Sequence, residues 1–134
     1  MSVYKALDSV SNKDVKIIVS SQTSEIGSAD KIVFPGQGAI GDCMTRLNQT
    51  GLEEKIKKLC ESKPFLGICL GLQSLMNSSE EDNGTRCLGI IDGHVKRFQK
   101  QAKTSKKEEL AKIPHMGWNN VYWERQHPLI KDIP

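Results

Sequence analysis

A short apolar run ending in a glycine-flanked cysteine decides how this chain is expected to fold: Phe65-Leu66-Gly67-Ile68-Cys69-Leu70-Gly71. Residues 65–68 are typical of a buried strand, and 70–76 of a helix. A glycine lies two residues before the cysteine and another two residues after it. This spacing is typical of an elbow turn, in which the nucleophile projects from a strand-to-helix bend. Side chains at Gly67 and Gly71 would collide with neighbouring backbone, so glycine is expected at both positions.

Such an elbow brings the Cys69 sulfur to the N-terminus of the following helix. Free backbone N–H groups and the helix dipole favour a thiolate there. The same groups suit the negative oxygen of a tetrahedral intermediate. The pentapeptide alone also fits a buried cysteine in an ordinary turn, and both interpretations stay open on it. The other cysteines, Cys43, Cys60 and Cys87, lack this setting and are expected to be core or half-buried.

A second glycine-rich segment follows the short apolar run 32–34: Pro35-Gly36-Gln37-Gly38-Ala39. Its two glycines free the backbone to turn and expose N–H groups, which could complete an oxyanion hole beside an elbow. Alone, the segment would be a plain tight turn. Both loops, however, follow predicted parallel strands, and ligands collect at the carboxyl ends of strands in open α/β sheets.

Helical and strand patterns alternate as far as residue 77, which predicts an α/β fold with a three-layer, mostly parallel open sheet and helices on both faces. Helices are predicted over 3–10, 42–48 and 52–60, a polar connection or single helical turn over 24–29, and strands over 15–19, 32–34 and 65–68. Later strands are predicted over 88–91, 94–98 and 120–123. The lysine-rich segment 99–112 is expected to be an exposed, mobile loop.

Length and composition limit the possible functions. A chain of 134 residues predicts one domain, residues 1–134. A net charge of +3 with few aromatic residues argues against nucleic-acid binding. No apolar run is long enough to span a membrane, so a cytoplasmic location is expected. The cysteines form no C-x-x-C pair and the histidines are scattered, so we expect reduced thiols, no metal site and no cofactor.

Three motifs together resemble the class I glutamine amidotransferases: residues 35–42, 63–73 and 78–81. The stretch Pro114-His115-Met116-Gly117-Trp118-Asn119 narrows the resemblance, together with 93–98 and 127–129. These segments resemble the glutaminase subunit of imidazole glycerol phosphate synthase, over nearly the whole chain. The resemblance implies hydrolysis of glutamine to glutamate and ammonia. The ammonia would pass to a cyclase (β/α)8-barrel subunit, the heterodimer partner, in histidine biosynthesis.

The same resemblance implies roles for the two loops. Cys69 would be the nucleophile that attacks the glutamine amide and forms a thioester. Gly36, Gln37 and Gly38 would form the oxyanion loop, and the resemblance implies that a peptide of this loop reorients before it donates. Gln37 stands where the family usually has a small apolar residue such as valine. The substitution leaves the backbone donors in place.

Other positions are implied to contact substrate or partner. Gln73 and Glu81 match positions that hold the glutamine. Met116, Gly117 and Trp118 match the surface that faces the cyclase, although Trp118 without the resemblance would be read as a core aromatic.

The resemblance also implies two features that these 134 residues do not contain. One is an apolar strand before the helix at 3–10, central in the family's sheet. The other is a catalytic His two residues before a Glu, which the family places beyond residue 134. No H-x-E sequence occurs here, and His94, His115 and His127 match other motifs. We therefore expect little or no glutaminase activity from these residues alone.

Two alternatives remain open. The chain could be the glutaminase subunit of another class I amidotransferase, although residues 116–118 argue against that. It could instead be a non-catalytic partner that docks on the cyclase, and the missing base keeps that interpretation open. Labelling by a glutamine-mimicking electrophile would discriminate, because only a formed pocket directs it to Cys69.

Overall fold

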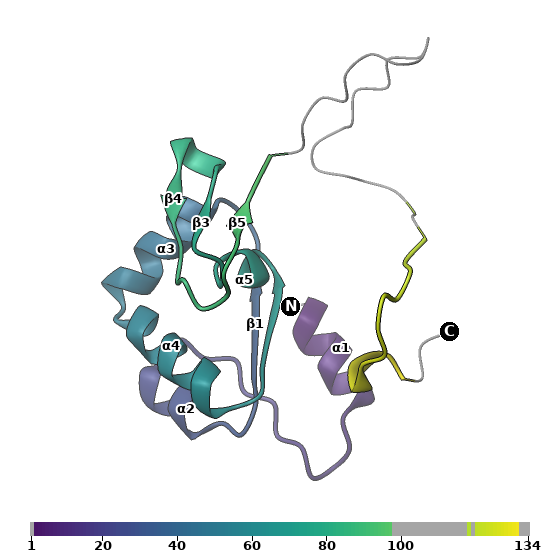
Figure 1. Cartoon of the computed structure of the whole chain (residues 1–134). Helices are drawn as coiled ribbons and strands as arrows, with labels where there is room; N and C mark the ends of the chain where they lie inside the picture. Colours follow the sequence, from purple (N-terminus) through teal and green to yellow (C-terminus); the bar gives the residue numbers. More distant parts are fainter. Residues whose placement is uncertain (1, 98–117, 119, 132–134) are drawn as a thin grey trace. The chain divides into compact units, whose positions relative to one another are not determined.

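The computed structural model describes residues 2–97, 118 and 120–131 of the chain (Figure 1). The chain divides into two compact units, residues 1–97 and residues 98–134. The predicted single domain over 1–134 stays a prediction. The predicted loop at 99–112 lies outside the described residues. The described part of the second unit contains one short helix, η2 (Pro128–Ile130), whose N-terminus is capped by His127.

The first unit is a mixed α/β structure, as predicted. Its described elements, in chain order, are α1 (Ser2–Val10), α2 (Thr23–Ser28), β1 (Ile32–Gly36), α3 (Ile40–Gln49), α4 (Leu52–Ser62), β2 (Phe65–Cys69), α5 (Leu70–Gln73), β3 (Ser78–Ser79), η1 (Glu81–Asn83), β4 (Thr85–Arg86) and β5 (His94–Val95). The helices predicted over 3–10, 42–48 and 52–60 and the strands predicted over 32–34 and 65–68 are confirmed. The connection at 24–29 is the helical turn α2.

The parallel pair β1–β2 positions the two glycine-rich loops. Its register runs from Ile32 opposite Phe65 to Gly36 opposite Cys69. The carboxyl ends of the two strands are therefore level, and the loops that leave them start side by side. A second, three-stranded sheet has β3 in the middle, antiparallel to β4 and parallel to β5.

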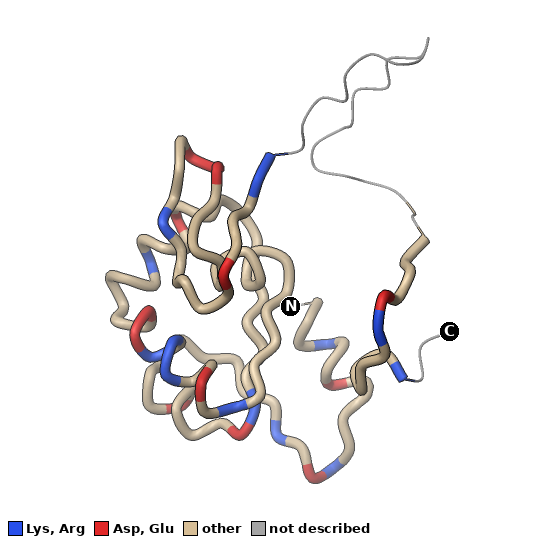
Figure 2. The backbone as a smooth tube through the Cα atoms, viewed as in Figure 1, with Lys and Arg blue, Asp and Glu red and all other residues tan. Residues whose placement is uncertain are grey.

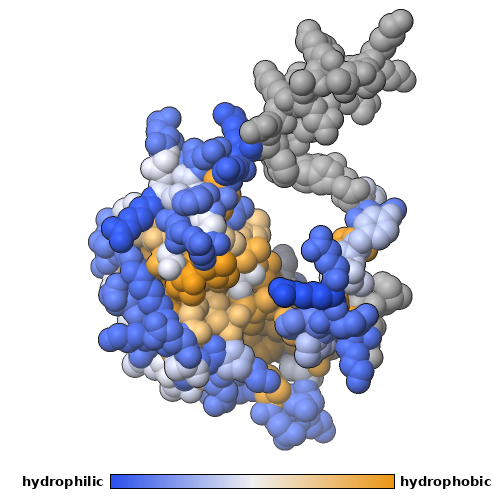
Figure 3. Space-filling view, in the orientation of Figure 1, coloured by the Kyte–Doolittle hydropathy of each residue, from blue (hydrophilic) through white to orange (hydrophobic). Residues whose placement is uncertain are grey.

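The main core of the unit lies between the helices and one face of the parallel pair. Figure 1 shows α2, α3 and α4 on one side of β1 and β2. The rings of Phe34 and Phe65 meet edge to face with centroids 6.2 Å apart, and both pack on this core. Its buried residues are Leu47, Leu52, Ile56, Leu75 and Leu88. Large apolar side chains also stay exposed, Leu66 and Leu72 among them, and Figure 3 shows apolar surface in the middle of the view.

Local sequence explains the buried face and the first turn of α4, and the residue after the helix connects it to α2. Its buried residues recur at helical spacing, on the face that meets the core: Leu52, Ile56 and Leu59. Glu53 and Glu54 lie in the first turn, where negative charge is favourable to the helix dipole. Lys63 follows the helix and donates from Nζ to the carbonyls of Gly27 (2.7 Å) and Ala29 (2.5 Å) at the end of α2. This lysine ties α2 to the start of β2.

Three predicted strands are wrong. Residues 15–19 have no strand partner in the described part of the chain, and a strand without a ladder does not persist. Residues 88–91 donate to the end of α5 instead: Leu88 N–H bonds to Ser74 O, and the N–H groups of Ile90 and Ile91 bond to Leu75 O. Residues 120–123 are irregular.

Two other elements are shorter than predicted. The helix after Cys69 ends at Gln73 rather than at 76, and β5 is two residues long. The free backbone carbonyls after α5 accept the bonds from 88–91, which explains its early end. Among the described residues, no helix combines the length and apolarity needed to cross a membrane.

Candidate functional site

Cys69 sits in a strained bend between β2 and α5. Its backbone has φ 54° and ψ −114°, and its side chain is exposed. Asp82 and Asn83 are the other non-glycine residues of the described chain with positive φ. A residue held in such a sparsely populated region costs about 1–3 kcal/mol and persists only where its surroundings enforce it.

The neighbouring glycines permit the bend, because the backbone passes too close to them for any side chain to fit. A Cβ on Gly71 would lie 1.8 Å from the carbonyl oxygen of Phe34, and one on Gly67 would lie 2.8 Å from the amide nitrogen of Leu72. A side chain at either position would therefore collide with neighbouring backbone, as predicted. A Cβ on Gly36 would also come within 2.9 Å of Leu70 Cβ. The glycine loop and the elbow are thus in direct contact.

The glycine loop leaves β1 at the level of Cys69. Gly36 is the register partner of Cys69, and Gly38 has φ 96° with open space around its Cα. Gln37 is exposed. The loop ends at Ala39, after which α3 begins. Because the loop backbone lies beside the sulfur-bearing bend, its N–H groups are candidates to meet an oxygen bound at Cys69.

Two carboxylates lie at the N-terminus of α3, those of Glu81 and Asp82. The sequence predicted a role for Glu81, as a residue that holds the glutamine, but none for Asp82. The N–H of Ile40 donates to Glu81 Oε2 at 3.3 Å, and the N–H of Gly41 donates to Asp82 Oδ2 at 3.1 Å. Figure 2 shows acidic positions in red at the turn that Figure 1 places between β3 and β4. No sequence pattern predicts the role of Asp82, because capping patterns are local and this cap comes from 41 residues away.

The other predicted site residues are dispersed. Gln73 is half-buried at the end of α5, and Glu81 is exposed in η1. Trp118, in the second unit, is fully exposed rather than a core aromatic. Met116 and Gly117 lie outside the described residues.

The remaining cysteines differ from Cys69 in environment. Burial raises the pKa of the Cys43, Cys60 and Cys87 thiols, with a partly opposing effect of the Arg46 charge at Cys43. These thiols therefore stay protonated at neutral pH and react slowly. Cys69 is the exposed thiol of the described chain.

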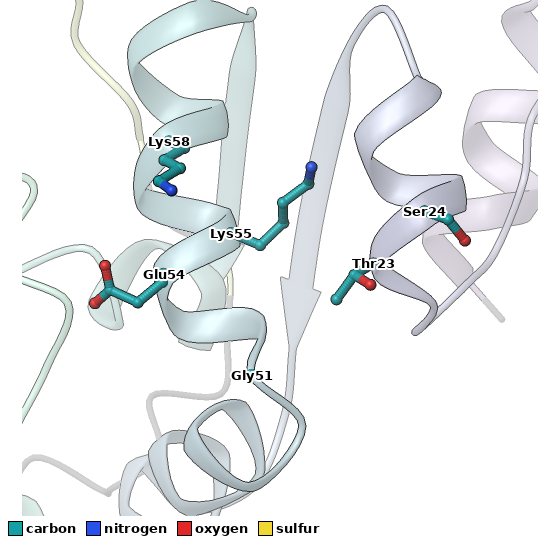
Figure 4. Close-up of a pocket in the computed structure, with 6 residues that line it drawn as sticks. All are labelled: Thr23, Ser24, Gly51, Glu54, Lys55 and Lys58. Atoms are coloured by element: carbon teal, nitrogen blue, oxygen red, sulfur yellow. The ribbon is translucent and has the colours of Figure 1, made fainter.

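Neither of two surface cavities contains the elbow. One, of about 420 Å³, lies between α2 and α4, with Lys55 extending from α4 toward α2 (Figure 4). The other, of about 400 Å³, lies on the three-stranded sheet, where Ser78 Oγ and His94 Nδ1 are 2.8 Å apart. Within the described ranges, no three His, Cys, Asp or Glu side chains gather as they would around a metal ion.

Comparison with known proteins agrees with the predicted resemblance to class I glutamine amidotransferases. The family model of the CobB/CobQ-like glutamine amidotransferase domain matches residues 1–122. Similar relatives share the name imidazole glycerol phosphate synthase subunit HisH. The protein from Nitrosococcus oceani is 48% identical over 133 residues, which cover 99% of this chain and 60% of that protein. The one from Methylococcus capsulatus is 46% identical over 134 residues, 99% of this chain and 61% of that protein.

A third relative has the same name. The subunit from Neisseria meningitidis serogroup B is 45% identical over 125 residues, which cover 93% of this chain and 58% of that protein. The chain thus spans about three fifths of the length of these relatives. The family match extends over most of the 134 residues, and the chain belongs to the CobB/CobQ-like glutamine amidotransferase domain family.

Proposed function

We propose that this chain carries the nucleophile and oxyanion loop of the glutaminase subunit of imidazole glycerol phosphate synthase. The relatives with that name match nearly all of this chain. The observation that carries the proposal is the exposed Cys69, held at positive φ directly opposite Gly36 of the glycine loop. An ordinary structural cysteine would not need that strained conformation.

The proposed reaction begins when the Cys69 thiolate attacks the side-chain amide carbon of glutamine. A C–S bond forms, and the carbonyl electron pair moves onto oxygen. The N–H of Leu70 and an N–H of the glycine loop would stabilise that oxyanion. A base returns the proton that it took from the thiol to the amide nitrogen, the C–N bond breaks, and ammonia departs, so that a thioester remains. Water cleaves the C–S bond, giving glutamate and the free thiol.

The short α5 changes one part of this mechanism. The sequence predicted a helix over 70–76 whose dipole would stabilise a thiolate, but α5 has only four residues. A single turn has a small dipole, so stabilisation has to come from individual N–H donors at the bend. Gln73 and Glu81 are proposed to hold the glutamine substrate.

We propose that these 134 residues alone have little or no glutaminase activity. A Cys-His mechanism needs a base that takes the thiol proton and returns one to ammonia. His94 is paired with Ser78 on the three-stranded sheet, and no His precedes a Glu by two positions in the sequence. Release of glutamate at more than trace rates by the purified chain with a cyclase subunit would contradict this proposal.

The proposed partner is the cyclase barrel, in a cytoplasmic heterodimer. The shared name of the relatives, a subunit of a synthase, supports it, and the fully exposed Trp118 indole is accessible to such a partner. We also infer that β1 and β2 belong to a larger open sheet with a helical layer on each face. The exposed apolar residues Leu66, Val15 and Ile18 are what such a sheet would cover.

A glutamine-mimicking electrophile tests the proposed site. The chloroketone analogue of glutamine should alkylate Cys69 and spare the other three thiols, with free glutamine slowing the reaction. Iodoacetamide, which needs no pocket, is the matched reagent, and Cys69→Ser is the matched variant. Equal labelling of all four thiols, or no protection by glutamine, would leave only the non-catalytic docking partner.

A further inference from the structure

The first turn of α3 is capped by a segment remote in sequence. Ala39, at the N-cap position, provides no side-chain hydrogen bond. Instead the Ile40 and Gly41 N–H groups donate to the carboxylates of Glu81 and Asp82. A carboxylate at a helix N-terminus accepts charge-assisted hydrogen bonds and interacts favourably with the dipole of this ten-residue helix.

The backbone on both sides is shaped for this contact. A Cβ on Gly41 would lie 2.7 Å from Asp82 Oδ2, so the carboxylate occupies the space that a side chain would take. Asp82 and Asn83 both have positive φ, which turns the acidic segment toward α3. Asp82 therefore reaches α3 through a conformation that has its own cost.

The acidic turn is itself held in place from within the unit. The N–H of Glu81 donates to the buried Ser79 Oγ at 3.1 Å, and Thr85 Oγ1 donates to the Glu81 carbonyl at 3.2 Å. The cap is thus anchored to β3 and β4 rather than attached to α3 alone.

We propose that Asp82 is a positioning residue for the oxyanion loop. The loop joins β1 to α3, so fixing the first turn of α3 fixes one end of the loop while Gly36 fixes the other. The effect on catalysis rests on the proposed glutaminase function. Glu81 connects glutamine binding to the capping of α3. Its carboxylate already accepts the Ile40 N–H, and a glutamine bound there would contact the same carboxylate. Substrate occupancy is thereby connected to the N-terminus of α3.

Hydrogen exchange of the full chain tests the cap without reference to activity. In Asp82→Ala, the Gly41 amide should exchange about tenfold faster than in the parent chain, since a hydrogen bond to a charged group is lost. Asp42→Ala is the matched control: it removes an exposed carboxylate from the same turn of α3, and within the described residues the structure shows no hydrogen bond to the Asp42 side chain. Equal exchange in the two variants would overturn the proposal.

Labelling kinetics test the consequence for the loop. Asp82→Ala should lower the maximal rate of Cys69 labelling by the chloroketone analogue about tenfold, by the same lost bond. The analogue concentration for half-maximal labelling and the iodoacetamide rate should stay the same. Glu81→Gln should instead raise the half-maximal concentration. Asp82→Asn should recover part of the rate, because its amide oxygen still accepts a hydrogen bond.

Gly41→Ala provides a second variant that keeps the carboxylate. Alone it should slow labelling as Asp82→Ala does, because the new Cβ displaces that carboxylate. Combined with Asp82→Ala it should add no further loss, whereas additive losses would contradict the contact. If the parent chain shows no preference for the chloroketone, the proposed function fails, and amide exchange then decides the positioning role by itself.

Discussion

Residues 15–19 and 65–69 are both five-residue runs of mainly apolar residues, yet only the second forms a strand. The first has the higher intrinsic strand preference, because four of its five residues are β-branched: Val15, Ile17, Ile18 and Val19. The second has one such residue and a glycine. Local preference therefore points to the wrong run.

The difference lies in what each run contacts. Residues 65–69 pair along their whole length with β1, and Phe65 packs on Phe34 and the main core. Val15, Ile18 and Val19 are all more than half exposed. Strand stability comes from ladder bonds and buried faces, and the first run has neither in the described chain.

Adding a methyl group at Gly71, in the elbow next to the paired run, should have the largest effect on stability. In Gly71→Ala the new Cβ would meet the Phe34 carbonyl, so α5 has to move away from β1. We expect a loss of about 4 kcal/mol or more in the free energy of unfolding, measured by urea denaturation. Gly51→Ala, which meets nothing at φ 67°, should cost only about 1–2 kcal/mol. Equal stabilities of the two variants would contradict the crowded elbow.

Truncating one side chain in each run should sharpen the contrast. Phe65→Ala removes a ring from the core and should cost about 3 kcal/mol. Val19→Ala should change stability by no more than about 0.5 kcal/mol, because Val19 is 79% exposed. Denaturant midpoints measured side by side test this. Similar losses at both positions would mean that residues 15–19 are packed in solution.

Relieving the strain at Cys69 should stabilise the paired run. Cys69→Gly should raise the free energy of unfolding by about 1 kcal/mol, since glycine accepts the backbone angles that cysteine adopts at a cost. Cys69→Ala is the control, because alanine keeps the strain and should gain nothing. A glycine variant that is less stable than the alanine variant in thermal melts would argue against a strained bend.

The outer face of α4 should affect the comparison least. Lys57→Met removes hydrogen bonds to Glu53 and Glu54 and should cost about 0.5 kcal/mol at neutral pH. The hydrogen bond from Lys57 lowers the pKa of Glu53, so its contribution is present above pH 4.5 and is lost as pH falls through the lowered pKa. The parent and variant curves of stability against pH should therefore converge in acid. A constant difference would contradict the ion pair.

The elbow was predictable because its constraints are local. Gly67 and Gly71 are required by backbone only a few residues away or one strand across, and the spacing around Cys69 expresses that requirement. The Asp82 cap was not predictable. Its partner at Gly41 lies far away in the chain, and no periodicity or capping pattern connects the two. The predicted strand at 88–91 failed for a similar reason, because its N–H groups bond to the end of α5.

The sequence by itself determined the order of helices and strands around the parallel pair and the bend that exposes Cys69, because glycine spacing and helical periodicity act over a few residues. Only the tertiary structure decided which apolar run becomes a strand, where α5 ends, and which carboxylates reach α3. Those outcomes depend on backbone groups finding partners far away in the chain, and a polar group is satisfied only where the folded chain brings a partner to it.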